Sequence, residues 1–179
     1  AKRMQRLNPL SASTYGVGEL ARHALDHGCK RLIFGLGGSC TNDFGCGIAC
    51  ALGVRFLNSQ GEAFCPSGGT LHEVKHMDLS QSRQLLHGCT VLAMCDIDNP
   101  LYGKTGAAHV FAPQKGADSP MVERLDQGLR HLAQTAARCL GEDKSQLPGA
   151  GAAGGLGFGM AAFCGASLHR GIDVVLDTL

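Results

Sequence analysis

The features that mark membrane, secreted or nucleic-acid-binding proteins are missing from this sequence of 179 residues. No apolar run approaches the ~20 residues that a membrane-spanning helix needs, and no signal-peptide pattern opens the chain. There is no N-x-[ST] acceptor for N-glycosylation. The formal net charge is only +1, which argues against a strong field for nucleic acid or an anionic membrane. We therefore predict a cytoplasmic protein that binds neither.

Cysteine is abundant, with nine residues, but its spacing does not predict a cysteine-based scaffold. The odd count and irregular spacing are untypical of a secreted disulfide framework. No Cys-x-x-Cys pair is present, whereas a zinc site usually has closely paired ligands. Cys46 and Cys50 would share one helix face at a spacing of i, i+4. We therefore predict thiols that pack as small apolar groups and no metal bound by cysteine.

Glycine is unusually frequent, at 26 of 179 residues, compared with roughly 7% in average proteins. The glycines cluster at 35–47 and 149–159 with apolar residues between them, which is untypical of a disordered linker. Glycine allows the backbone to pass close to a ligand or to a neighbouring helix. Both clusters are therefore candidate sites of close approach.

Strand-like and helical segments alternate along the chain. Apolar runs predict buried strands over Arg31–Leu36 and Thr90–Cys95. Helical spacing predicts the longest helix over Pro120–Leu140, with Asp118 or Ser119 as its N-cap. This order predicts a single α/β domain over 1–179, with a mixed, largely parallel sheet and helices packed on its faces. The other predicted elements are helices over 16–28, 43–52, 81–87 and 171–179, an apolar helix after the second glycine cluster, and strands over 54–58 and 62–65.

The segment Gly35–Gly47, GLGGSCTNDFGCG, places small polar residues at a strand-to-helix turn. Open α/β sheets bind ligands at the carboxyl ends of their strands, and helix N-termini attract anions. The segment therefore predicts a site for a phosphate or a carboxylate, although it is not a Walker P-loop because no Lys-Ser/Thr pair follows. Asp43 lies near the predicted helix start, where it is either a functional group or an N-cap.

Two further polar segments are candidates for phosphate chemistry. Asp96 and Asp98 follow a buried strand in CDIDNP, and Mg²⁺ is usually held by one or two carboxylates together with substrate phosphates. The alternative is a polar turn in which Asp98 and Asn99 bond to their own backbone. Lys115 in FAPQKGA could meet a phosphate as a point charge, or it could be an ordinary exposed lysine.

The second glycine cluster matches the pattern G-x-G-x-x-G through Gly149, Gly151 and Gly154. A dinucleotide-binding fingerprint requires a buried strand directly before the first glycine. Here the preceding residues, GEDKSQLP, are polar and end in proline. The cluster therefore indicates close helix packing, or a loop near a ligand, rather than a dinucleotide site.

Taken together, the segments GGSCTNDFG, CDIDNPLYGKTGA, FAPQKGA and PGAGAAGGLGFG resemble the class I (bacterial type) glycerate kinases, as does STYGVGEL. The resemblance covers about 8–179. It implies ATP-dependent, Mg²⁺-requiring phosphorylation of D-glycerate to a phosphoglycerate, with 2-phosphoglycerate as the expected product. The N- and C-terminal parts of the family have no match, so we expect a fragment that is mostly the second α/β domain of a two-domain kinase.

The resemblance suggests roles for individual side chains. Asp43 would accept the proton of the attacking hydroxyl, and Lys115 would offset charge on the transferring phosphoryl group. Cys40 and Phe44 replace small residues of the family, and Phe44 needs room that would alter the lip of the site. A non-catalytic phosphate- or organic-acid-binding module remains the alternative function, and a homodimer is left open. The expected Mg²⁺ ligands are Asp96, Asp98 and Asn99, and the expected substrate- or phosphate-binding residues are Gly37, Gly38, Ser39, Thr41, Asn42, Gly149 and Gly151.

Overall fold

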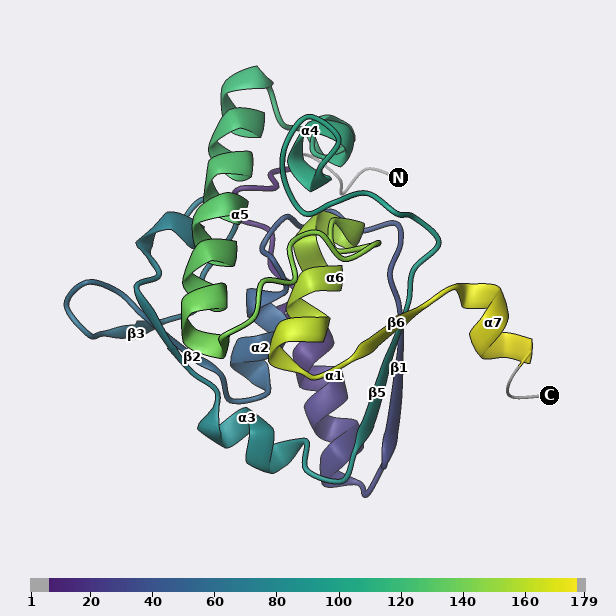
Figure 1. Cartoon of the computed structure of the whole chain (residues 1–179). Coiled ribbons are helices and arrows are strands. Elements are labelled where there is room, and N and C mark those ends of the chain that lie inside the picture. Colours follow the sequence, from purple (N-terminus) through teal and green to yellow (C-terminus); the bar gives the residue numbers. More distant parts are fainter. Residues whose placement is uncertain (1–6, 177–179) are drawn as a thin grey trace.

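Two small sheets and the helices around them make up the fold in Figure 1, which shows a computed structural model that describes residues 7–176. One sheet is parallel and has the strand order β1-β5-β6. The other is antiparallel and has the order β3-β2-β4. The strands are β1 (Arg31–Gly35), β2 (Arg55–Leu57), β3 (Ala63–Phe64), β4 (His76–Asp78), β5 (Thr90–Met94) and β6 (Ser167–His169).

The predicted α/β class is confirmed, but the expected single mixed sheet is divided into two. After β2 the chain reverses at once through a turn in which Gly61 N–H donates to Asn58 O. β2 therefore pairs with β3 and β4 and does not join the parallel sheet. The helices are α1 (Tyr15–Asp26), α2 (Cys46–Ala51), α3 (Ser80–Leu85), α4 (Ala107–Phe111), α5 (Ser119–Leu140), α6 (Ala152–Phe163) and α7 (Gly171–Leu176), with 3-10 turns η1 (Leu71–Glu73) and η2 (Pro113–Lys115).

Local sequence patterns predicted several of these elements well. α5 begins as expected, because Asp118 Oδ1 accepts a hydrogen bond from Met121 N at 2.9 Å and so caps the helix. β4, β6 and α4 were not predicted, because each is short and lacks a distinctive pattern. The last helix is described up to Leu176, and the rest of the predicted segment lies outside the described residues.

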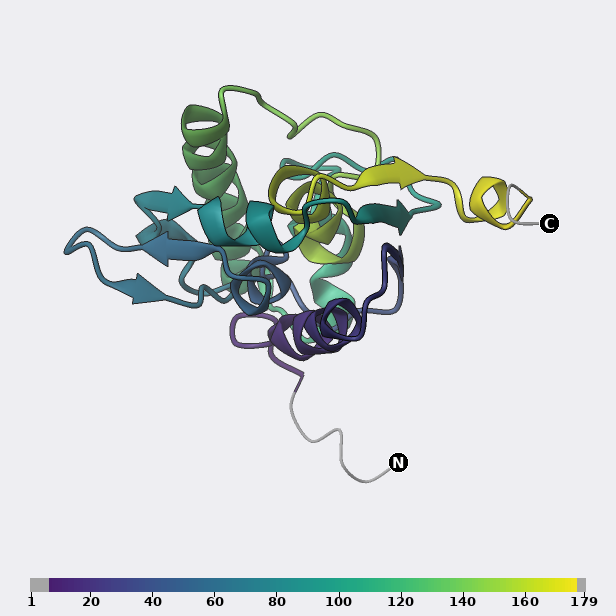
Figure 2. The same ribbon diagram turned by 90° about the horizontal axis from the view of Figure 1, so that it is seen from below.

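The parallel sheet is covered on one side only within residues 7–176. Figures 1 and 2 show α1, α2 and α6 between the two sheets, whereas only α7 extends beyond the parallel sheet on the other side. β1 alternates accordingly: Leu32 and Phe34 are half-buried, and Ile33 is 43% exposed. Parallel sheets in proteins usually have both faces covered. No helix in the described part of the chain is both long and apolar enough to cross a membrane.

The two glycine clusters pack against each other at the centre of the molecule. A Cβ atom added to Gly154 would overlap Thr41 O and lie 2.6 Å from Asn42 Cα, so only glycine allows this approach. Phe44 N also donates to Gly154 O at 3.2 Å. Close packing, one of the two alternatives that the sequence allowed for the second cluster, is therefore what the structure shows.

Phe44 lies in the core, and the expectation that it would alter the lip of a site is wrong. Its side chain is fully buried, and its ring centroid lies 4.7 Å from that of Phe158 and 5.9 Å from that of Phe163. The backbone of Phe44 has a φ of +61°, in the left-handed region that few non-glycine residues adopt. This conformation belongs to the turn that leads into α2.

We predict that Phe44→Ala lowers the free energy of unfolding by about 3–5 kcal/mol, because it leaves a cavity where the buried ring packs. Urea unfolding of this chain measures the change. Leu20→Ala is the matched control, since the Leu20 side chain is 72% exposed, and it should change stability by no more than about 0.5 kcal/mol. A Phe44→Ala loss as small as that of the control would contradict the core position.

Candidate functional site

A cavity of about 190 Å³ lies where the loops that follow β1 and β5 meet η2. β1 and β5 are parallel neighbours in the register Arg31↔Thr90, so both carboxyl ends reach the same edge of the sheet. This is where open α/β sheets place their ligands. A larger hollow of about 350 Å³ lies between α3 and the end of α6, but none of the predicted residues lines it. The residues that line the smaller cavity include Gly37, Gly38, Ser39, Ile97, Gln114 and Lys115.

Lys115 is buried, with only 4% of its surface exposed, so the alternative of an ordinary exposed lysine is wrong. Its Nζ donates to Thr41 O at 2.7 Å and to Ser39 Oγ at 3.1 Å. An ammonium group has three N–H donors, and the described residues accept two of them. The third remains available to a ligand in the cavity.

Burial also changes the charge state of Lys115. Loss of water around the ammonium lowers the pKa of Lys115 from 10.5 to about 8, and the nearby Cys40 and Asp43 oppose the shift only in part. The side chain therefore remains mostly cationic at neutral pH. An anion in the cavity would favour the charged form and raise this pKa.

Thr41 and Asn42 lie behind the cavity wall rather than on it. Both residues are buried, and neither lines the cavity. Within residues 7–176, Thr41 Oγ1 and both polar atoms of the Asn42 amide have no hydrogen-bond partner. Buried polar atoms without partners are rare in native proteins. The predicted anion-binding set is thus divided: Gly37, Gly38 and Ser39 face the cavity, and these two residues do not.

Asp43 faces away from the cavity, toward the first turns of α1 and α2. Its Oδ2 accepts hydrogen bonds from Thr14 N at 2.7 Å, Thr14 Oγ1 at 2.9 Å and Gly47 N at 3.3 Å. Its Oδ1 accepts one from Gly45 N at 3.2 Å. Burial raises the pKa of Asp43, and these hydrogen bonds oppose the rise. Because three of the donors are backbone amides, which cannot accept, the site is built for a carboxylate.

This geometry corrects the role predicted for Asp43. The side chain is fully buried and does not line the cavity, so it does not reach a substrate hydroxyl there. It is not the N-cap residue of α2 either, because Gly45 occupies that position. Its oxygens nevertheless hold the amides of Gly45 and Gly47 at the start of the helix. Asp43 is therefore placed to position the loop rather than to act as a base.

Sequence reasoning missed Thr14 as the main partner of Asp43. Thr14 Oγ1 donates to Asp43 and accepts from Ile48 N at 3.0 Å, so it connects both helices. Thr14 is the N-cap residue of α1, but its side chain makes no capping bond to that helix. In the sequence, the only signal for Thr14 was its place in the segment STYGVGEL, which resembles the family. Among the cavity residues, Ile97 and Gln114 were also missed, although each is a sequence neighbour of a predicted residue.

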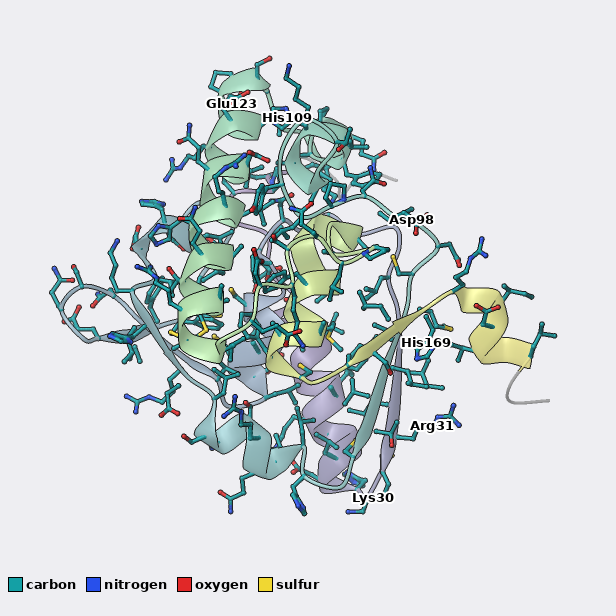
Figure 3. All side chains as sticks on the ribbon, viewed as in Figure 1. Lys30, Arg31, Asp98, His109, Glu123 and His169 are labelled. Carbon is teal, nitrogen blue, oxygen red and sulfur yellow. The ribbon has the colours of Figure 1, made fainter. Side chains whose placement is uncertain are left out.

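Two of the three predicted Mg²⁺ ligands make hydrogen bonds within the chain. Asp96 Oδ1 accepts from Gly171 N at 2.8 Å, and Asn99 Nδ2 donates to Thr105 O at 2.9 Å, so both make structural bonds. Figure 3 shows Asp98 on the loop beyond one end of β1, with Lys30 and Arg31 at the other end. Among the described residues no group of three or more His, Cys, Asp or Glu side chains could hold a metal ion. The exposed Asp98 would supply one carboxylate to Mg²⁺, and phosphate oxygens would have to supply further ligands.

Gly149 and Gly151 pack against the loop that carries these aspartates. A Cβ added to Gly149 would lie 2.8 Å from Cys95 Sγ, and one added to Gly151 would overlap Pro100 O. Gly151 N–H donates to Asn99 O at 3.0 Å. Both glycines are buried and neither lines the cavity, so the structure leaves no room for a ligand at their Cα atoms. The binding role predicted for them is replaced by a packing role.

Comparisons with known proteins agree with the family resemblance that the sequence segments indicated. The model of the glycerate kinase family matches residues 2–179. The chain belongs to this family. It is 51% identical over 173 residues to a glycerate kinase of Bacillus cereus and 40% identical over 175 residues to the glycerate 2-kinase of Escherichia coli. A solved structure assigned as glycerate kinase 2 from Salmonella typhimurium LT2 superimposes with a TM-score of 0.92 at 46% identity.

These matches include nearly all of the chain but less than half of each relative. They cover 97% of the chain against 45% of the Bacillus protein, and 98% against 46% of the Escherichia protein. The Salmonella structure is covered to 46%, and this chain to 96%. The family's shared fold therefore extends over the cavity, the Asp43 contacts and both glycine clusters of this chain.

We predict that Asp43→Asn destabilises the chain by about 1–3 kcal/mol, because the amide nitrogen of asparagine cannot accept the N–H bonds that a carboxylate oxygen accepts. Urea unfolding at neutral pH measures the loss. Asp98→Asn is the control, since Asp98 is exposed and makes no bond within residues 7–176. Native stability of Asp43→Asn, combined with lost turnover in a longer protein that contains this chain, would return Asp43 to the chemistry.

Proposed function

We propose that this chain is one α/β domain, mostly the second, of a two-domain glycerate kinase that transfers a phosphoryl group from ATP to D-glycerate. The observation that carries the proposal is the cavity at the carboxyl ends of β1 and β5. There the buried ammonium of Lys115, the Ser39 hydroxyl and the backbone of Gly37 and Gly38 line one space. These groups are suited to an anion. The name of the Escherichia relative, glycerate 2-kinase, supports 2-phosphoglycerate as the product.

Phosphoryl transfer depends mainly on positioning and on neutralising negative charge. Lys115 supplies a positive charge that the protein has already desolvated, so its attraction to an anion is stronger than in water. Gly38 has a φ of +62°, which lets the backbone turn beside the cavity where a side chain would be strained. In this proposal Lys115 offsets charge on the phosphoryl group as it is transferred.

The size of the cavity limits what it holds. Its volume is about 190 Å³, whereas pockets for drug-sized ligands typically measure about 300–1,000 Å³. A three-carbon acid or the terminal phosphate of ATP fits, and a whole nucleotide does not. ATP supplies the phosphoryl group, and Mg²⁺, held by Asp98 and phosphate oxygens, would neutralise part of its charge. We also propose a cytoplasmic location and no nucleic-acid partner, and a homodimer stays a prediction.

A non-catalytic module that binds phosphate or an organic acid is the second candidate. One observation favours it: no carboxylate is among the residues that line the cavity. The chain also spans less than half of the relatives it matches. A loose transition state needs little help from a base, so this observation does not exclude the kinase.

Glycerate-dependent release of ADP tests the kinase proposal. The assay uses this chain and a longer protein that contains it, each with ATP, Mg²⁺ and D-glycerate. The longer protein should turn over, and 3-hydroxypropionate, which lacks the 2-hydroxyl, should be inert. Adding enolase alone identifies the product, because enolase forms phosphoenolpyruvate from 2-phosphoglycerate and not from the 3-isomer. Glycerate binding without ADP release would favour the second candidate.

We predict that Lys115→Met lowers kcat/KM of the active protein by at least about 10²-fold, the effect of removing one preorganised group that stabilises the transition state. Steady-state ADP release measures it. Lys30→Met is the matched control, because Lys30 is exposed and lies at the opposite end of β1 from the site (Figure 3). An equal, small effect of both substitutions would remove Lys115 from the proposed chemistry.

The pKa of Lys115 predicts how binding depends on pH. Because burial lowers this pKa to about 8, the ammonium is present below pH 8 and is lost as the pH rises above it. KM for glycerate should therefore rise, or kcat fall, on the alkaline side of pH 8. The same titration with Lys115→Met should show no such step. An unchanged alkaline limb in the variant would assign the step to another group.

A further inference from the structure

The loop between β5 and α4 joins two groups of residues that line the cavity. Ile97, near the start of this loop, lines the cavity, and so do three residues that follow the loop in α4 and η2, namely Phe111, Gln114 and Lys115. Residues 98–106 connect these two groups along the chain. The path of the loop therefore decides whether Ile97 and Lys115 face the same space.

Hydrogen bonds within the loop brace it. Asn99 Nδ2 donates to Thr105 O at 2.9 Å, and Ala107 N donates to Leu101 O at 3.1 Å. Gly103 lies midway between these bonded residues, and its φ of +90° lets the chain reverse there. A contact that holds Gly103 therefore holds both arms of the loop.

A buried carboxylate from α5 holds Gly103. Gly103 N donates to Asp126 Oδ1 at 2.6 Å, and only 8% of the Asp126 side chain is exposed. The other oxygen, Oδ2, lies 3.4 Å from Arg130 Nη2. The guanidinium of Arg130 in turn lies 4.4 Å from the centre of the Tyr102 ring, within the range of a cation–π contact. Both carboxylate oxygens are thus engaged, and the long helix α5 fixes where they lie.

A second contact between α4 and α5 lies at the surface. His109 Nε2 is 3.9 Å from Glu123 Oε1, and the two side chains, labelled in Figure 3, are 27% and 65% exposed. Exposed ion pairs contribute little to stability, whereas a hydrogen bond to an ionised acceptor is among the stronger kinds. The bond from Gly103 to the buried Asp126 is therefore the contact that we expect to hold the loop in place.

We propose that Asp126 is a positioning residue of the site. It does not line the cavity and acts through Gly103, whose hydrogen bond keeps Ile97 and Lys115 facing one space. The inference rests on the proposed function, in which Lys115 offsets charge on the phosphoryl group. Without this bond the loop should open and water should reach Lys115, which would raise the pKa of Lys115 from about 8 toward its ordinary value.

Limited proteolysis of this chain tests the anchor without any enzyme activity. Lys104 is exposed and directly follows Gly103, so trypsin can cut there when the loop opens. Asp126→Ala should speed cleavage after Lys104 by about tenfold or more, because loss of a hydrogen bond to a charged acceptor increases the open population. Asp126→Asn keeps an oxygen that accepts from Gly103 N and should stay close to wild type. Mass spectrometry of the new termini measures the rate.

Two further measurements keep this test decisive. Glu123→Ala is the matched control, because it removes an acidic side chain of the same helix that contacts α4 only at the surface, and it should leave the cleavage rate unchanged. Amide exchange of the wild-type chain needs no variant: the Gly103 amide should exchange at least about tenfold more slowly than that of the exposed Lys104. Equal exchange of these two amides, or unchanged cleavage of Asp126→Ala, would overturn the proposal.

Kinetics of a longer protein that contains this chain test the effect on the reaction. Asp126→Ala should raise KM for D-glycerate by about tenfold or more, since misplaced groups bind and orient a substrate poorly. It should also move the alkaline fall in kcat/KM from about pH 8 to higher pH, as Lys115 becomes hydrated. Cys40 and Asp43, whose charges act on Lys115, are unchanged in the variant.

His131→Ala is the control for a general loss of stability. His131 Nε2 lies 2.9 Å from Val74 O, so the substitution removes a contact of the same helix with a different segment. It should leave the alkaline fall at about pH 8. If His131→Ala and Asp126→Ala lower activity equally and neither moves the alkaline fall, the positioning role is wrong. Absence of turnover in the wild-type longer protein would contradict the proposed function instead, and proteolysis and amide exchange would still decide whether Asp126 anchors the loop.

Discussion

The buried carboxylate of Asp43 is the interaction on which the arrangement of the site depends. Transfer of a carboxylate out of water is costly unless donors surround it, and here backbone amides from the starts of α1 and α2 and the Thr14 hydroxyl do so. A carboxylate with this many donors has one favourable orientation. The two helix starts and the loop that joins β1 to α2 are therefore fixed relative to each other.

A buried cation holds the same loop from its other side. Lys115 donates to Thr41 O and Ser39 Oγ, only a few residues before Asp43. The Asp43 carboxylate thus lies behind the loop, and protein donors satisfy it. The Lys115 ammonium lies in front of the loop, and one of its N–H donors has no acceptor among the described residues. This asymmetry explains why the cavity lies on the Lys115 side. It also explains why Asp43, the only acidic residue of the loop, serves the structure, although its sequence position suggested chemistry.

Features encoded by local pattern could be predicted, and features made by distant contacts could not. The strands β1 and β5 and the capped start of α5 follow from apolar runs and from Asp118 beside its own helix. The role of Asp43 depends on Thr14, 29 residues away, and no local pattern connects the two. An exposed Lys115 was one of the two alternatives, because most lysines are exposed. The hydrogen-bond partners that hold it in the interior lie more than 70 residues away in the sequence. The place of Gly37 and Ser39 at the carboxyl edge of the parallel sheet was predictable, because both directly follow the predicted strand β1.

The cavity has groups suited to an anion, but under the proposed function it lacks groups that a kinase centre needs. It is too small for a whole nucleotide, its lining includes no carboxylate, and Asp98 is the only predicted Mg²⁺ ligand without another bond within residues 7–176. The parallel sheet that carries it also leaves one face uncovered, which is unusual for such sheets. The relatives are more than twice as long as the matched region. Under the proposed function, the nucleotide pocket and the remaining charged groups would lie in the parts of the longer relatives that this chain does not match.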